Sequence, residues 1–349
     1  MESSLSETNK ARRVYTSFVN RTLSHGTTTC CYYATKDLST TNLLATICHS
    51  LGQRAYIGRV CMDSLSPDYY RDESVEFGVQ ASQDSIKFIR ELDPSGALVN
   101  PIITPRFAPS CTAPYLKALG SLATETGAHI QTHISENKPE IQLVQELFPD
   151  SKSYADVYDT AGLLTPKTIL AHAVHLSEEE RVLCKERGAK ISHCPASNTA
   201  LTSGCAPVRE LLDAGLTVGL GTDVSGGFSP SILEECRQAI WVSRFVAMGN
   251  GDAAKLSTEE ALYLATRGGA AVVGMEEKIG GFGVGMEWDA QMVRLGVVNG
   301  EGENGQGPVD VFGWESWEDR VNKWVYSGDD RNTVGVWVKG RLVYGSEEL

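Results

Sequence analysis

Thr-His-Ile-Ser-Glu at residues 132–136 closes an apolar, strand-like run that begins at Ala128. A second run of this kind ends shortly before Asp223. A histidine and an aspartate at the ends of separate strands can hold a divalent metal ion. Glu136, three residues past His133, can move protons beside such an ion. These two stretches therefore predict a metal-dependent hydrolase.

Strand-like runs alternate with helix-like stretches from the start of the chain to about residue 275. The strand-like runs are Thr27–Tyr33, Arg54–Met62, Val99–Arg106, Ala128–Ile134, Thr168–His172, Ala189–His193 and Thr217–Gly221. Strands that alternate with helices predict a parallel sheet, here with roughly seven units where a closed (β/α)8 barrel has eight. The sequence contains no His-x-His pair, which hydrolases of this kind usually take from their first strand. We therefore predict an α/β fold, a metal-dependent-hydrolase (β/α)8-type barrel that lacks its first strand.

The composition changes after about Gly280. A Gly- and Asn-rich stretch, Gly296–Gly307, has the character of a local insertion. The tail Thr333–Tyr344 alternates valines with small or polar residues and turns at Lys339-Gly340, which indicates a hairpin. A few strands cannot form a stable sheet alone. The predicted division is a truncated (β/α) barrel over residues 1–278 and a remnant of a small β-sandwich with the C-terminal strands over residues 279–349.

The charge and the cysteines narrow the class of protein. The chain has 349 residues, with 31 basic and 44 acidic side chains and a net charge of −13. This balance argues against a nucleic-acid backbone or an anionic membrane as a partner. Nine scattered cysteines, without a C-x-x-C pair, and a polar N-terminal stretch are typical of a reduced, cytoplasmic protein.

Further strand-end residues are candidates for the site. His172 ends its run, and we assign it to the inward face of the barrel. Arg106 lies next to Phe107, and an arginine beside an aromatic ring can grip and stack a planar polar ligand. A surface salt bridge is the alternative for Arg106, and a helix cap or a turn is the alternative for Asp223.

The remaining candidate histidines are expected to have supporting roles. We expect His129 to be a hydrogen-bonded core residue, His175 to lie on the surface and His193 to lie close to the site. Other zinc chemistries lack their motifs, because the chain has neither H-E-x-x-H nor H-x-E with P-C-x-x-C.

Several stretches together resemble a known family. They are Gly26–Thr29, Gly52–Ala55, Thr104–Phe107, His129–Asn137, His193–Pro195, Gly219–Gly227 and Gly328–Asn332. They resemble the amidohydrolase superfamily, and most narrowly its guanine deaminases. The strand-end histidines and aspartate are shared across the superfamily, whereas the Arg-Phe pair and the Gly-Asp-Asp-Arg-Asn stretch point to the guanine enzymes. The similarity covers essentially the whole chain but begins after the family's first strand.

The resemblance implies zinc-dependent hydrolytic deamination of guanine to xanthine and ammonia. His133 and Asp223 would be ligands of one zinc ion per chain, and the absent His-x-His pair would supply the others. Glu136 would protonate the ring nitrogen next to the attacked carbon. His172 would orient the metal-bound water, and Asp223 would accept its proton.

The resemblance also implies a small-molecule purine as the partner, held by Arg106 and Phe107 with His133, Glu136 and Asp223, and it suggests a homodimer. Two alternatives stay open at this point. The chain could be a catalytically impaired, truncated relative that binds purines or another subunit. It could also be an amidohydrolase that acts on another heterocyclic amine.

Overall fold

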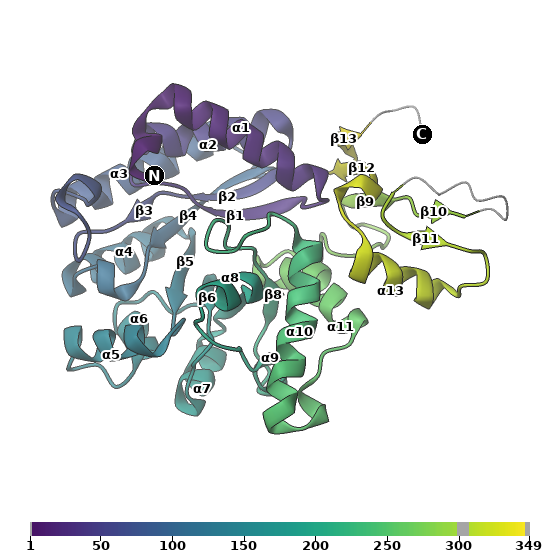
Figure 1. The fold of residues 1–349 in the computed structure, drawn as a ribbon. Coiled ribbons are helices and arrows are strands. Elements are labelled where there is room, and N and C mark those ends of the chain that lie inside the picture. The colour runs from purple at the N-terminus through teal and green to yellow at the C-terminus, as the bar shows by residue number, and fades with distance from the viewer. Residues whose placement is uncertain (1, 299–306, 346–349) are drawn as a thin grey trace.

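The computed structural model describes residues 2–298 and 307–345, and Figure 1 shows their arrangement. One parallel sheet has the order β1-β2-β4-β5-β6-β7-β8, and the short β3 also pairs with β4. The strands are β1 (Thr29–Tyr33), β2 (Arg54–Gly58), β3 (Val60–Cys61), β4 (Val99–Pro105), β5 (His129–Ile134), β6 (Thr168–His172), β7 (Lys190–His193) and β8 (Val218–Leu220). Within the described ranges, β1 and β8 each pair on one side only, so the sheet is open between them. The predicted parallel sheet is confirmed, and it forms a partial barrel.

Helices accompany the strands, and most of them cover the outer face of the sheet (Figure 1). They are α1 (Thr8–Ser24), α2 (Leu38–Leu51), α3 (Val75–Leu92), α4 (Ala113–Thr126), α5 (Lys138–Leu147), α6 (Tyr154–Thr160), α7 (Glu178–Arg187), α8 (Pro195–Ala200), α9 (Val208–Asp213), α10 (Ile232–Asn250), α11 (Thr258–Tyr263) and α12 (Gly269–Val272). None of the helices in the described part of the chain is both long and apolar enough to cross a membrane.

The core shows which strand residues point inward. Ile103 and Leu170 belong to the large cluster between the strands and the helices. Their neighbours Ile102 and Ile169 belong instead to a small cluster inside the barrel. Neighbouring residues on a strand therefore point to opposite faces, as the alternation of side chains requires.

The C-terminal segment forms a separate small layer beside the barrel (Figure 1). Strand β12 (Thr333–Val338) pairs antiparallel with β13 (Arg341–Gly345) and with β9 (Ala290–Val293). The predicted hairpin with its turn at Lys339-Gly340 is thus confirmed. Strands β10 (Gly296–Val297) and β11 (Asp310–Val311) form a second pair, and helix α13 (Trp317–Ser327), which the sequence analysis missed, follows.

Two expectations about this segment stay predictions. Most of the insertion expected at Gly296–Gly307 lies outside the described residues. The domain boundary between residues 278 and 279 falls between α12 and β9. A buried contact crosses this boundary, because the Arg54 guanidinium of β2 forms ion pairs with Glu287 at 2.6 Å and with Asp289 at 3.1 Å.

Candidate active site

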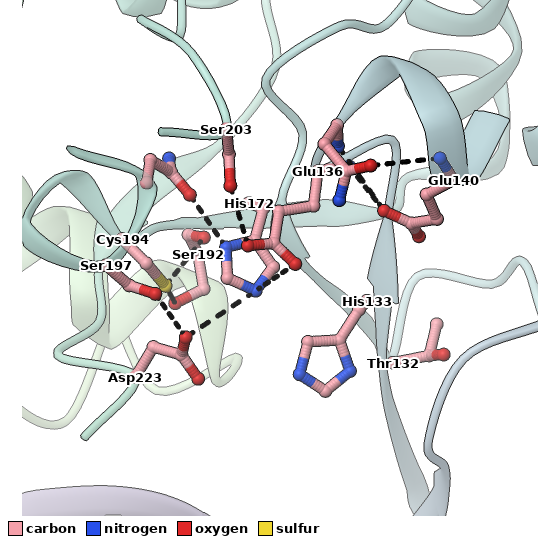
Figure 2. Close-up of polar contacts among 12 residues, drawn as sticks. Thr132, His133, Glu136, Glu140, His172, Ser192, Cys194, Ser197, Ser203 and Asp223 are labelled. Atoms are coloured by element: carbon pink, nitrogen blue, oxygen red, sulfur yellow. Dashed lines mark hydrogen bonds and ion pairs between the residues drawn. The ribbon is translucent and has the colours of Figure 1, made fainter. Parts of the chain in front are cut away.

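Three side chains that could bind a metal ion meet at the carboxyl ends of the strands. His133 lies in β5, His172 is the last residue of β6, and Asp223 follows β8. One ligand atom from each lies within 4.8 Å of the others. Figure 2 shows them facing one another, with Glu136 close by. The sequence predicts this meeting, because the carboxyl ends of parallel strands come together at one end of a barrel.

His133 is held as a neutral imidazole with one nitrogen available. Its Nδ1–H donates to the backbone carbonyl of Arg106, which leaves the Nε2 lone pair free. Its ring stacks on that of His172, with 5.2 Å between the ring centroids. Burial, together with the neighbouring His172, lowers the pKa of His133 to about 4. A neutral imidazole is the form that binds metal ions.

His172 reaches the site in a way that the strand pattern did not predict. Its neighbours in β6 show that inward positions alternate with outward ones, and His172 shares the outward parity of Leu170. Our assignment of His172 to an inward position was therefore wrong. The backbone leaves the strand at this residue, with φ of +73°, and this turns the side chain toward the site. The imidazole is 1% exposed, and its Nε2 lies 3.8 Å from Glu136 and 3.9 Å from Asp223.

Asp223 lies in a tight glycine-rich loop, with φ of +44°. Its Oδ2 accepts a hydrogen bond from Ser197 Oγ at 2.6 Å. A Cβ atom on Gly226 would lie 2.6 Å from this same carboxylate oxygen, so any larger residue there would push Asp223 aside. The glycine leaves the room that the carboxylate needs. Asp223 therefore faces the other two possible metal ligands, and its backbone carbonyl also accepts from the N–H of Gly227 at 2.7 Å, as in the turn that we considered as an alternative.

Glu136 lies between β5 and helix α5. The helix begins with a capping box formed by Asn137 and Glu140, and the backbone N–H of Glu136 donates to the Glu140 carboxylate at 3.1 Å. This arrangement fixes the backbone at Glu136. Its side chain is 17% exposed, and Ser203 Oγ donates to its Oε1 at 2.9 Å. The second carboxylate oxygen faces His172, so Glu136 can exchange protons with a ligand bound at this site.

Arg106 and Phe107 lie beside this group. The Arg106 Nη1 donates to both carboxylate oxygens of Glu2, at 3.0 and 3.1 Å. Both residues line a cavity of about 350 Å³ together with Glu2, but neither Glu136 nor any of the three possible metal ligands belongs to its lining. The Phe107 ring packs edge-on against His133, with 6.4 Å between the ring centroids. Arg106 therefore lines a cavity and also forms the salt bridge that we considered as its alternative role.

The other histidines divide into two groups. His129 lies at the start of β5 with its ring against Tyr56 and is half-buried, so it matches the expected core position only in part. His175 is half-buried, and its Nε2 donates to the carbonyl of Ser203 at 2.8 Å, so the expected surface position holds only in part. His193 is fully buried, and among the described residues neither of its ring nitrogens has a hydrogen-bond partner.

Buried histidines predict a loss of stability in acid. Burial lowers the pKa of His193 from 6.5 to about 3. The unfolded chain then takes up a proton that the folded chain does not, so this contribution to stability is complete above about pH 6.5 and is lost as the pH falls toward 3. Glu235, whose pKa burial raises to about 8, acts in the opposite direction. The informative quantity is therefore the difference in the free energy of unfolding between the native chain and a variant that lacks His193.

We expect the free energy of unfolding of the native chain to fall relative to that of a His193→Asn variant over this range, by on the order of a few kcal/mol. Urea unfolding of both proteins at a series of pH values measures this difference. A difference that stays constant with pH would show that His193 titrates normally in the folded chain.

Comparison with known proteins places this chain in a family. The amidohydrolase family model matches residues 1–343. A probable guanine deaminase of Schizosaccharomyces pombe is 52% identical over 348 residues, which is 99% of this chain and 65% of that protein. The guanine deaminase of Dictyostelium discoideum is 46% identical, over 95% of this chain and 72% of its own length. The crystal structure of guanine deaminase from C. acetobutylicum with bound guanine has a TM-score of 0.88 and 32% identity, and the match covers 98% of this chain and 78% of that one.

The chain therefore belongs to the amidohydrolase family, whose metal-dependent-hydrolase barrel it shares. Within that family its similarity is to the guanine deaminases, as the sequence stretches predicted. The chain spans about two thirds of the length of the S. pombe relative.

Proposed function

We propose that this site catalyses the zinc-dependent hydrolytic deamination of guanine to xanthine and ammonia. The observation that supports it most is the grouping of His133, His172 and Asp223 within 4.8 Å, with the Glu136 carboxylate 3.8 Å from His172. The relatives that carry the name guanine deaminase support guanine as the substrate. No observation favours a purine-binding relative without activity or a different heterocyclic amine.

The donor atoms fit a zinc ion. An imidazole nitrogen from His133 and a carboxylate oxygen from Asp223 are ligands that zinc prefers, and His172 lies in the same group, where its Nε2 would face the water rather than the ion. A bound zinc ion would supply hydroxide as the nucleophile near neutral pH. Asp223 would hold the zinc and accept a proton from the attacking water. We propose the ligand roles of His133 and Asp223 on this basis.

The remaining residues would act on the substrate and on protons. Glu136 would give a proton to the purine ring nitrogen next to the carbon that loses ammonia, which neutralises charge as that carbon is attacked. The Nε2 of His172, between Glu136 and Asp223, would orient the attacking water. Arg106 would donate to acceptors of the purine from the rim of the cavity, and the Phe107 ring would contact its face.

An Arg106→Ala variant should bind guanine less tightly and still retain zinc. We expect kcat/KM for guanine to fall roughly 10- to 100-fold, mainly through KM, because one charge-assisted hydrogen bond contributes about 1.5–3 kcal/mol. Steady-state kinetics and zinc analysis of the same preparations measure both effects. Arg106→Lys keeps the charge without the planar fork and should be intermediate. Equal losses of substrate binding and zinc would mean that Arg106 only holds the structure together through Glu2.

The direct test of the proposed reaction is a substrate panel. Guanine, adenine and cytosine are offered separately to the zinc-loaded protein, and ammonia and the purine products are measured. We expect ammonia and xanthine to appear in equal amounts from guanine, with much slower release from the other two bases. Release of ammonia from adenine or cytosine at a similar rate would overturn the assignment of guanine.

Two further proposals concern the setting of the enzyme. All nine cysteines are unpaired in the structure, which supports a reduced, cytoplasmic location. Helix α10 exposes Trp241, Phe245 and Met248 at successive turns of one face, which supports a homodimer that would cover them.

Sedimentation of the purified protein tests the proposed homodimer. We expect the mass of two chains, and a mass of one chain would contradict the dimer.

A further inference from the structure

One short segment holds three residues of the site. Helix α8 (Pro195–Ala200) and the turn after it follow strand β7, and Figure 2 shows their side chains next to the site. Ser197 Oγ donates to Asp223 at 2.6 Å, and Ser203 Oγ donates to Glu136 at 2.9 Å. Between them, the Asn198 Oδ1 bonds with His172 Nδ1 at 2.8 Å. The segment therefore contacts three residues that come from separate parts of the sheet.

The bond from Asn198 determines which nitrogen of His172 carries the proton. The carbonyl oxygen of an asparagine side chain is an acceptor only, so the Nδ1 that faces it must be the donor. In a neutral imidazole the other nitrogen then carries the lone pair. That nitrogen is Nε2, which faces Glu136 at 3.8 Å and Asp223 at 3.9 Å. The lone pair of His172 is thus directed into the site.

Asn198 is itself firmly held. It is 1% exposed, its backbone N–H donates to the carbonyl of Cys194 at 3.0 Å, and its own carbonyl accepts from Ser203 at 2.8 Å. The helix is anchored from behind, where the N–H of Ala196 donates to the fully buried Glu235 carboxylate of α10 at 3.1 Å. The backbone of Asn198 is therefore set by the fold, and the contact with His172 Nδ1 is the one side-chain hydrogen bond of Asn198 among the described residues, because its buried Nδ2 has no partner there.

We propose that Asn198 is a positioning residue that keeps His172 in the Nδ1–H tautomer, with the Nε2 lone pair available to the reacting water. The Arg106 carbonyl acts on His133 in the same way, so the two stacked imidazoles both present Nε2 to one point. The catalytic consequence rests on the proposed function, whereas the tautomer does not. A backbone carbonyl, that of Arg106, orients His133, whereas a side chain, that of Asn198, orients His172 and can be changed by mutation.

Nuclear magnetic resonance of the whole chain with ¹⁵N-labelled histidine tests the proposal without any turnover. Two-bond ¹⁵N–¹H correlations distinguish a protonated from an unprotonated ring nitrogen, and a His172→Gln variant identifies the His172 signals. We expect Nδ1 to be protonated and Nε2 unprotonated in the native chain. An Nε2–H tautomer of His172 in the native chain would overturn the proposal.

Variants separate positioning from general packing. Asn198→Ala should shift His172 toward the Nε2–H tautomer, whereas Asn198→Asp keeps an acceptor oxygen and should restore the Nδ1–H signal. Ser203→Ala is the matched control, because it removes the bond to Glu136 and leaves His172 untouched. If Asn198→Ala does not fold, the His172 signals of the native chain and of Asn198→Asp still test whether His172 carries its proton on Nδ1. An unchanged His172 signal in a folded Asn198→Ala protein would contradict the proposal.

Activity provides a second, separate readout. In Asn198→Ala we expect kcat for guanine to fall roughly 10- to 100-fold, the range found when a partner of a metal-site histidine is removed, with KM little changed. If the native chain does not deaminate guanine, the proposed function fails while the tautomer result stands. If the tautomer shifts and kcat does not fall, the positioning role in catalysis is excluded.

Discussion

Replacing Glu136 with glutamine is expected to lower kcat for guanine roughly 10²- to 10⁴-fold, the range for loss of a general acid or base. Glutamine has nearly the same shape and can still accept the hydrogen bond from Ser203, but it cannot give up a carboxylic proton. The ring nitrogen next to the attacked carbon would then stay unprotonated. Zinc content should stay unchanged, because His133 and Asp223 are intact.

The control for this variant is Glu146→Gln, which changes an exposed carboxylate on the same helix α5. It should leave kcat, KM and zinc content as they are. Steady-state kinetics with guanine, together with metal analysis, measure all three. Near-native turnover by Glu136→Gln would show that another group transfers the proton.

The second large effect is expected when Asp223 is replaced with asparagine. This change removes the charged side chain from the group of three, and with it the group that we propose accepts a proton from the attacking water. We expect the affinity for zinc to fall by more than about 100-fold, the upper range for residues that only support a metal ligand. Turnover of guanine should fall to background even at saturating zinc, because proton acceptance is lost as well.

Titration with a zinc-competing dye measures the affinity, and kinetics at saturating zinc separate the two effects. Asp213→Asn is the matched control, because Asp213 is exposed at the end of helix α9. It should bind zinc as the native chain does. Unchanged zinc affinity in Asp223→Asn would remove Asp223 from the metal site.

The sequence predicted the positions of those candidate residues that depend only on the order of the strands. His133 and Asp223 each follow an apolar run, and parallel strands bring their carboxyl ends together whatever the loops do. The parallel sheet was predictable for the same reason, since strands and helices alternate along the chain.

His172 shows where strand periodicity stops being informative. The alternation of side chains holds within β6, but a residue with φ of +73° no longer follows the strand. Nothing in the apolar pattern marks such a residue. The prediction of its location was right for the wrong reason, because its side chain reaches the site by a turn of the backbone.

The supporting contacts were missed because they join distant parts of the chain. Ser197 and Asn198 follow His193–Pro195, one of the stretches that carry the family resemblance, but their partners are Asp223 and His172. The salt bridge between Arg106 and Glu2 likewise spans 104 positions. Hydrophobic periodicity carries no information on such pairs. The position directly after a strand end was the one available signal for Ser197 and Asn198.

The most direct test of the account is a combined measurement of zinc and product on the purified 349-residue chain. The protein is stripped of metal, titrated with zinc and assayed with guanine at each step. We predict that xanthine production rises with bound zinc and levels off at about one zinc ion per chain, as a single catalytic site requires. Absence of zinc binding, or bound zinc without xanthine above the metal-free rate, would contradict the assignment of this site as a zinc-dependent guanine deaminase centre.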